Sequence, residues 1–268
     1  KTRLLEGDRV VVCGGAIEST KLLLSSHSEY WPKGLGGSSD HLGQHLTAHP
    51  LLKLMIGIKS NPERLAQEIH FPTRCSRALD TPRQQRDGKM IIFPFGGPSV
   101  PIAEMIGQGK TRDEVEAAVT GPAQMLLAGL LEMHEGIGSR LELATGRNQL
   151  GLPRTKIHFE WEKQSLQYAA AQRITLENLA RAMGWEPLSF AIDQSSNSRV
   201  GVRADHVTGT CRMSQEPSAG VVDSTLRVHD TENVWVCSNA VFPSSGAANP
   251  TVTLAALSAR LVDLWTGF

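Results

Sequence analysis

The chain has 268 residues, of which 40% are hydrophobic and 20% charged, and its 27 lysines and arginines balance 27 aspartates and glutamates. A formal net charge of zero leaves no electrostatic footprint for nucleic acid or for an anionic membrane surface. No stretch approaches the roughly 20 apolar residues that a membrane-spanning helix needs. The composition therefore excludes wholesale disorder, and the length suits one large domain or two small ones with a sizeable core.

The opening of the chain is typical of one unit of a nucleotide-binding sheet. Residues 9–13 form a β-branched run that predicts a buried strand, Gly14 and Gly15 end this run, and residues 16–26 carry apolar side chains at helical spacing. A strand of this kind ordinarily lies inside a larger sheet. We therefore expect the chain to be the trailing part of a longer protein.

Further elements follow in chain order. The patterns predict a loop over 32–40, then a helix capped by Thr111, and a second helix that begins after Gly121-Pro122 and reaches His134. A half-buried strand over 157–161, an amphipathic helix over 165–183 and a buried strand over 234–237 follow. The last predicted element is a helix over 250–265, with Asn249 as its N-cap and Pro250 at its first position.

Four cysteines are spread along the chain without a Cys-x-x-Cys pair, namely Cys13, Cys75, Cys211 and Cys237. This spacing argues against a zinc ribbon, a redox dithiol and a disulfide scaffold. We therefore expect free thiols, most of them in the core.

Residues 107–111, Gly-Gln-Gly-Lys-Thr, precede a predicted helix and resemble a phosphate-binding loop. That motif requires a glycine where this chain has Glu104, and residues 99–106 make a poor parallel strand. We favour a capped helix start. A nucleotide-dependent enzyme that uses Lys110 is the lowest-ranked alternative.

Three histidines, His41, His45 and His49, are spaced so that they would share one face of a helix and could bind a metal there. Gly43 and Pro50 weaken this helix, so we favour loop histidines and no metal site. The serine pairs at 38–39 and 195–196 lack the Gly-x-Ser-x-Gly elbow of a hydrolase.

The last quarter of the chain carries the most specific pattern. Residues 206–213 read His-Val-Thr-Gly-Thr-Cys-Arg-Met, residues 221–228 read Val-Val-Asp-Ser-Thr-Leu-Arg-Val, and residues 241–253 contain Phe-Pro and then Asn-Pro-Thr. This order closely resembles the C-terminal end of the glucose-methanol-choline (GMC) oxidoreductases, flavoenzymes that oxidise alcohols and sugars.

Earlier segments are similar to the same family. Residues 15–26 resemble its second signature, although Thr20 stands where the pattern usually has Ser or Pro, and His27 where it has Gly. Residues 42–50 are similar to the segment that leaves the cofactor domain. Residues 150–158 resemble the substrate domain of the sugar-oxidising branch, which contains pyranose oxidases and glucoside dehydrogenases.

The resemblance implies a fold and a division of the chain. The fold is α/β, with part of an FAD-binding Rossmann-like domain and a substrate domain that has an antiparallel sheet and helices. Residues 1–45 would be the trailing part of the FAD-binding domain, 46–195 the substrate domain, and 196–268 a return into the FAD-binding domain with the catalytic residues.

The resemblance also implies an activity, the oxidation of a CH–OH group by hydride transfer to flavin N5. His206 corresponds to the family's general base, and an imidazole is suited to accept a hydroxyl proton near neutral pH. Asn249 corresponds to the second polar residue, which would hydrogen-bond the same substrate oxygen without competing for the proton.

Cofactor contacts follow from the same comparison. The start of the last helix would face the flavin, where the reduced anion develops charge. Ser238 stands where the family often has an acidic residue. The implied FAD contacts are Gly14, Gly15, Ala16, Ser238, Asn239, Pro250 and Thr251.

The chain lacks the Gly-x-Gly-x-x-Gly motif that binds the ADP half of FAD, because residues 34–39 and 136–141 lack the third glycine. We therefore expect three partners: an N-terminal half that carries this motif, a small-molecule sugar or alcohol substrate, and an electron acceptor of unknown kind. The alternative is a non-catalytic remnant or a split subunit of the same fold without its own FAD site.

Overall fold

A computed structural model describes residues 6–58, 89–95, 102–120, 123–134, 138–190 and 201–267. Cys75 and the serine pair at 195–196 lie outside these ranges. The chain divides into two compact units, the first composed of Lys1–His49, Met133–Glu162 and Arg203–Phe268, and the second of Pro50–Glu132 and Lys163–Val202. The functional division of the chain at residues 45 and 195 stays a prediction.

The first unit contains a short parallel sheet of β1 (Val10–Val12) and β9 (Val234–Val236), in which Val12 pairs with Val236. Helix α1 (Gly15–Ser25) follows β1 directly, so the predicted strand, glycine turn and helix are confirmed. The prediction that β1 is buried is wrong for Val10 and Val11, which are 47% and 38% exposed. In the described part of the chain β1 pairs with β9 alone.

The core of this unit joins α1, β9 and the segments between β8 and α6 (Thr251–Thr266). Trp235 of β9 packs edge to face against Trp265 of α6, with ring centroids 5.0 Å apart. Leu261 is the buried residue of α6, so this helix rests on the core along a narrow stripe. The predicted strand over 234–237 and the last helix are confirmed.

A β-hairpin also belongs to the first unit and consists of β5 (Arg140–Arg147) and β6 (Pro153–His158). The sequence predicts a strand over 157–161, and the observed strand lies earlier in the chain. Its bounds follow from the pairing, because Arg140 pairs with His158 and Arg147 with Pro153.

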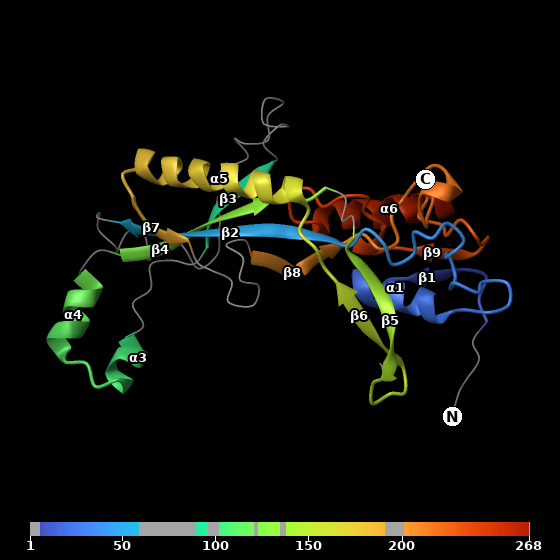
Figure 1. The fold of residues 1–268 in the computed structure, drawn as a ribbon, viewed down its shortest axis with the longest axis horizontal. Coiled ribbons are helices and arrows are strands. Elements are labelled where there is room, and N and C mark those ends of the chain that lie inside the picture. The colour runs from blue at the N-terminus through green and yellow to red at the C-terminus, as the bar shows by residue number, and fades with distance from the viewer. Residues whose placement is uncertain are drawn as a thin grey trace. The chain divides into compact units, whose positions relative to one another are not determined.

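The second unit contains antiparallel strands in the order β3 (Met90–Phe95), β4 (Ala123–Leu131), β2 (Thr47–Ile58) and β7 (Glu186–Phe190), and β8 (Gly201–Thr208) pairs with β2. Helix α5 (Lys163–Ala182) runs along this sheet, which confirms the predicted amphipathic helix (Figure 1). Leu176 of α5 is fully buried, and Gly129 of β4 leaves the space that its side chain and Met90 occupy.

The helix predicted between Gly121-Pro122 and His134 is wrong, because this segment forms β4. Met125, Leu127, Leu130 and Leu131 are all buried, and β4 pairs on one edge with β2 and on the other with β3. A continuous apolar run fits a strand that is covered on both faces as well as it fits a buried helix. Neighbouring strands from distant parts of the sequence decide the outcome here.

Two short helices precede β4, namely α3 (Ile102–Gly107) and α4 (Arg112–Thr120). The predicted start at Thr111 is confirmed: the amide of Glu114 donates to Thr111 Oγ1 at 3.3 Å, and the amide of Thr111 donates to Glu114 Oε2 at 2.8 Å. This reciprocal pair is a capping box. In the parts of the chain that the structure covers, no helix has both the length and the apolar character needed to cross a bilayer.

Candidate functional site

A cavity of about 290 Å³ lies in the first unit, at the start of α6. The start of β2, the end of β8, the loop before α6 and the first turns of α6 contribute its walls. The residues that line it are His49, Thr208, Met213, Phe242, Pro243, Ser244, Ser245, Gly246, Ala248, Pro250, Thr253 and Leu257. Imidazole and hydroxyl groups therefore alternate with apolar side chains, as in sites that bind small polar molecules.

Helix α6 begins one residue later than the sequence predicts. Pro250 is its N-cap, and the Pro250 carbonyl accepts the Leu254 amide at 3.0 Å. Asn249 is exposed and does not cap the helix, so the predicted capping role is wrong. The first turn of α6 carries amides without intrahelical partners, and it lies at the wall of the cavity.

His206, the predicted base, lies on β8 and contacts His49 of β2. The two Nδ1 atoms are 2.9 Å apart, and the rings meet edge to face with centroids 4.9 Å apart. His206 is 8% exposed and His49 is 1% exposed. The expectation that His49 is a loop histidine is wrong, because it is part of a strand and one of the residues that line the cavity.

A second pair stabilises the same two strands. Thr47 Oγ1 lies 2.6 Å from Thr208 Oγ1, and both side chains are buried. Because side chains on one face of a strand recur every second residue, Thr47 and His49 share a face of β2, and His206 and Thr208 share a face of β8. The two threonines therefore help to fix the register that brings the two histidines together.

The loop after β8 forms hydrogen bonds with helix α1. Thr210 Oγ1 lies 2.7 Å from Thr20 Oγ1 and donates to the Ala16 carbonyl at 3.2 Å. Thr20 Oγ1 also lies 3.2 Å from Cys211 Sγ. All of these side chains are buried. Thr20, which departs from the family pattern, thus links helix α1 to the segment after His206.

The same loop runs beside residues 239–241, because the amides of Gly209, Cys211 and Met213 donate to the carbonyls of Asn239, Ala240 and Val241. These residues form a short 3₁₀ helix, η3 (Asn239–Val241), whose N-cap Ser238 accepts the Ala240 amide at 3.2 Å. Two predicted cofactor residues, Ser238 and Asn239, therefore lie next to the loop that follows the predicted base.

Gly14 and Gly15 are exposed at the carboxyl end of β1, and Ala16 is buried in the first turn of α1. Ser238 and Asn239 follow the carboxyl end of β9. Because β1 and β9 are parallel, both groups lie at the same edge of the sheet, where open α/β sheets bind their ligands.

Polar atoms without partners mark two places around the site. Among the described residues, Asn239 Oδ1 and Ser245 Oγ are buried and have no hydrogen-bond partner, and Ser245 is 1% exposed. A buried polar atom without a partner costs free energy unless a ligand or water satisfies it. The residues present therefore fit a polar cofactor at the sheet edge and a polar ligand in the cavity.

The metal alternative is not supported by the arrangement of the histidines. His41 Nδ1 lies 2.9 Å from His45 Nε2 and the two rings stack, whereas His49 pairs with His206. Within the residues that the structure places, no three His, Cys, Asp or Glu side chains are grouped so that they could hold a metal ion.

The phosphate-loop alternative is wrong, because helix α3 rather than a strand precedes Lys110. Lys110 itself is part of an exposed ion pair with Glu114 at 2.8 Å. This contact and the Thr111 hydrogen bonds lower the pKa of Glu114 to about 2.

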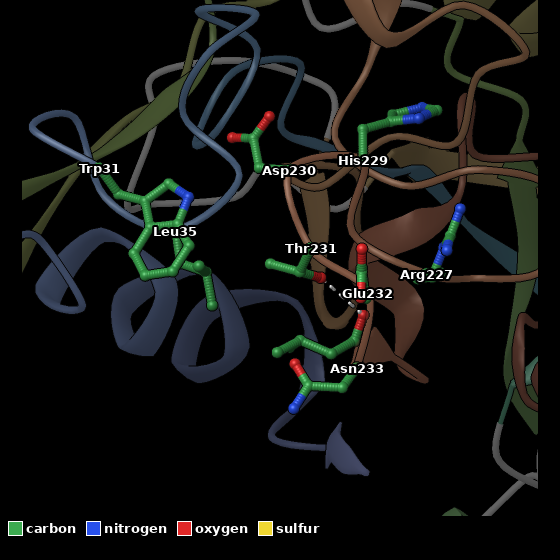
Figure 2. Close-up of a pocket in the computed structure, with 9 residues that line it drawn as sticks. Trp31, Leu35, Arg227, His229, Asp230, Thr231, Glu232 and Asn233 are labelled. Atoms are coloured by element: carbon green, nitrogen blue, oxygen red, sulfur yellow. Dashed lines mark hydrogen bonds between the residues drawn. The ribbon is translucent and has the colours of Figure 1, made fainter. Parts of the chain in front are cut away.

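A larger cavity of about 710 Å³ lies elsewhere in the first unit, between the loop after α1 and the segment that leads into β9 (Figure 2). Trp31 and Leu35 form one side, and His229, Asp230 and Glu232 are among the polar residues of the other. Several of these groups already have partners: the amide of Ser38 donates to Asp230 at 3.3 Å, and His229 Nε2 lies 3.2 Å from Ser214 Oγ. This cavity resembles a solvated surface hollow more than a ligand site.

The cysteines differ sharply in expected reactivity. Burial raises the pKa of Cys211 to about 12, and partial burial, followed by the neighbouring Cys237 thiol, raises the pKa of the exposed Cys13. At mildly alkaline pH we expect iodoacetamide to modify Cys13 slowly, at a rate that increases with pH, and to leave Cys211 unmodified. Peptide mass spectrometry of native and urea-denatured samples measures both, and equal labelling of the two in the native protein contradicts this prediction.

Solved structures share the fold of this chain. The chain has a mixed α/β fold that matches pyridoxine 4-oxidase from Mesorbium loti with a TM-score of 0.56 and 17% identity, covering 97% of this chain and 52% of that one. It also matches formate oxidase from Aspergillus oryzae RIB40, in a structure concerned with modification of its FAD, with a TM-score of 0.60 and 15% identity, covering 95% and 53%.

A family comparison gives a related result. Residues 138–258 match the family model described as GMC oxidoreductase. The predicted fold class and the predicted resemblance are confirmed.

Individual relatives are similar along nearly the whole chain. The large subunit of fructose dehydrogenase from Gluconobacter japonicus is 26% identical over 94% of this chain and 46% of its own length. 6'''-Hydroxyparomomycin C oxidase from Streptomyces lividus is 26% identical over 94% of this chain and 43% of its own length. Paromamine 6'-oxidase from Streptomyces fradiae is 27% identical over 94% of this chain and 44% of its own length. The chain thus spans about half the length of these relatives.

Sequence reasoning missed His49 and Ser245 as members of the site. The alternation of Thr47 and His49 just before the apolar run of β2 is a signal that could have found His49, because it indicates a strand with two polar side chains on one face. No signal in the sequence distinguishes Ser245 from other loop serines.

Proposed function

We propose that this chain supplies the catalytic residues of an FAD-dependent oxidoreductase that oxidises a CH–OH group of a sugar or another alcohol. The observation that supports this most is the buried His206–His49 pair beside a polar cavity at the start of α6, in a chain of which residues 138–258 match the GMC oxidoreductase family. The similarity to fructose dehydrogenase and to two aminoglycoside oxidases favours a polyhydroxylated substrate.

A bound FAD would supply the acceptor for the hydride that leaves the substrate carbon. His206 takes the proton of the substrate hydroxyl, so that one proton and one hydride leave the alcohol and a carbonyl compound forms. Asn249 would hold the same oxygen through its amide. The hydroxyl of Ser245, which has no partner among the described residues, would bind a further hydroxyl of the substrate.

Two groups of residues would hold the cofactor. Gly14, Gly15, Ala16, Ser238 and Asn239 lie at the carboxyl ends of β1 and β9, and the unpartnered Asn239 Oδ1 can accept a hydrogen bond there. Pro250 and Thr251 begin α6, whose first-turn amides favour negative charge. The chain would depend on a segment with the dinucleotide motif, because the described residues offer no equivalent.

The test is anaerobic reduction of bound FAD by a panel of sugars and simpler alcohols. Two forms of the protein are each incubated with FAD: the 268-residue chain, and a polypeptide extended by the sequence encoded upstream of Lys1. We expect the oxidised flavin absorbance to disappear with at least one sugar in the extended form. A folded, flavin-loaded protein that no member of the panel reduces would contradict the proposal.

The alternative is a split subunit or a non-catalytic remnant of the same fold. The observation that favours it is the coverage of about half of each relative. It predicts that the chain folds without binding FAD, and that an extended form either does not exist or is equally colourless.

A further inference from the structure

We propose that Cys13 and Cys237 form a reversible disulfide that joins β1 to β9 at the carboxyl edge of their sheet and thereby regulates how firmly this edge holds the cofactor. The regulatory part rests on the proposed function. The spacing of the cysteines in the sequence does not indicate the pair, because the two residues lie near opposite ends of the chain.

The pairing of β1 with β9 brings the two cysteines together. The strands are parallel and lie side by side (Figure 1), and Val12 pairs with Val236, so the residues that follow this pair are Cys13 and Cys237. The amide of Cys237 donates to the Val12 carbonyl at 2.9 Å, which extends the ladder to this residue. Neighbouring strands lie about 4.8 Å apart, and a disulfide needs Cα atoms about 4.4–6.8 Å apart. The register therefore brings the two cysteines within bridging distance.

On β9, the side chain of Cys237 faces helix α6. Trp235 packs against Trp265 of α6, and side chains on one face of a strand recur every second residue. Cys237 therefore shares the face of Trp235. A direct contact agrees with this placement, because Cys237 Sγ lies 3.0 Å from Ser258 Oγ of the same helix.

On β1, Cys13 falls on the same face. The guanidinium carbon of Arg9 lies 4.9 Å from the centroid of the Trp265 ring, so Arg9 faces α6, and Cys13 follows it by two alternations. The influence of the second thiol agrees with this position: burial, and after it the Cys237 thiol, raises the pKa of Cys13. A charge has this effect only on a close neighbour. The two sulfur atoms therefore lie near each other beside α6.

The thiols differ in access. Cys13 is exposed and Cys237 is partly buried, so a small molecule reaches Cys13 first. Cys211 is fully buried, and burial raises the pKa of its thiol to about 12, so it should not take part. The raised pKa of Cys13 slows its attack, because the thiolate is the nucleophile. Whether the bridge forms at equilibrium is a separate matter, set by its reduction potential against that of the surrounding thiols.

The oxidant is a small-molecule disulfide, and the reaction balances with it. The Cys13 thiolate attacks one sulfur of the small disulfide, a mixed disulfide forms, and one small thiolate leaves and takes up the proton that Cys13 lost. The Cys237 thiolate then attacks the Cys13 sulfur, the protein disulfide forms, and the second small thiolate leaves and takes up the Cys237 proton. Two electrons thus pass from the cysteine sulfurs to the small disulfide, and an excess of small thiol reverses both steps.

The bridge would act on the proposed cofactor residues, because Gly14 follows Cys13 directly and Ser238 follows Cys237 directly. A bond between the two cysteines would stop the ends of β1 and β9 from separating. Holding a site in its binding conformation favours the bound ligand. The disulfide form should therefore release FAD more slowly than the dithiol form.

Equilibration in mixtures of oxidised and reduced glutathione tests the bridge itself. Trypsin should place the four cysteines in four different peptides, because lysines or arginines flank each of them. After free thiols are alkylated, we expect mass spectrometry to find the Cys13 and Cys237 peptides joined in oxidising mixtures and separate after treatment with dithiothreitol. Cys75→Ser is the control and should form the same bridge.

A second variant shows what failed closure looks like. In Cys237→Ser the thiol that resolves the mixed disulfide is gone, so we expect a stable glutathione adduct on Cys13. The bridge is overturned if Cys13 of the unaltered protein keeps such an adduct, stays a free thiol in oxidising mixtures, or joins Cys75 or Cys211 instead.

The release of FAD tests the regulatory part. The extended polypeptide is loaded with FAD, equilibrated in an oxidising or a reducing glutathione mixture and diluted, and flavin fluorescence reports the release. We expect release from the disulfide form to be slower by about threefold or more, and Cys13→Ser to release FAD at the same rate in both mixtures. Equal rates for the two forms of the unaltered protein overturn the regulation. If the extended protein binds no FAD, the proposed function has failed and the regulation falls with it, whereas the joined peptides still decide the bridge.

Discussion

Replacing His206 with asparagine should slow the reduction of bound flavin by a sugar by about 10²- to 10⁴-fold, the range typical for loss of a general base. The asparagine amide can keep a hydrogen bond toward His49 Nδ1, but it cannot take up the substrate proton. Stopped-flow absorbance of the flavin under anaerobic conditions measures the step directly. The loss should be in the maximal rate of reduction, because the substrate would still bind in the cavity.

Folding must be controlled in this experiment, because His206 is 8% exposed and bonded to a buried partner. Circular dichroism and thermal unfolding of the variant show whether the fold persists. His229→Asn is a matched control: His229 is a partly buried histidine of the same unit, and it contacts Ser214 instead of His49. A folded His206→Asn variant that reduces flavin as fast as the His229→Asn control excludes His206 as the base.

The sequence predicts an element well where residues close together in the sequence determine its conformation. The strand, glycine turn and helix of residues 10–25 depend on β-branched residues, positive-φ glycine and helical spacing, all of which are readable locally. The segment 123–131 is different, because its apolar residues suit a strand or a buried helix equally. Pairing with β2 and β3, which come from other parts of the chain, makes it a strand.

The same limit applies to the site. The motif around His206 is specific enough to indicate its family, but the motif does not contain its partner. His49 lies far from His206 in the sequence, and the two meet only because β2 pairs with β8. The exposure of Val10 and Val11 is likewise not predictable from a run of valines, since it depends on which elements pack against the two faces of β1.

Replacing Gly209 with alanine should lower the free energy of unfolding by about 3–5 kcal/mol, a loss seen only for severe steric or packing defects. Gly209 adopts a φ of +80°, and a Cβ there would lie 2.0 Å from the His45 carbonyl oxygen. The obstacle is backbone, so no side-chain rotation can relieve it. The Gly209 amide also donates to the Asn239 carbonyl at 3.1 Å, which restricts how far the loop can move. Urea unfolding monitored by fluorescence measures the loss.

Gly151→Ala separates the cost of a left-handed backbone conformation from the cost of the clash with the His45 carbonyl. Gly151 belongs to the same unit and has a similar φ of +76°, but a Cβ there would meet nothing within 4 Å. It should therefore lose only about 1 kcal/mol, the cost of a left-handed conformation without a clash. A Gly209→Ala variant as stable as Gly151→Ala would show that the loop after β8 can withdraw from His45 at no cost. The expected difference between the two variants would instead mean that the close contact between Gly209 and the His45 carbonyl helps to hold His206 beside His49. This contact keeps the end of β8 next to the residues that lead into β2.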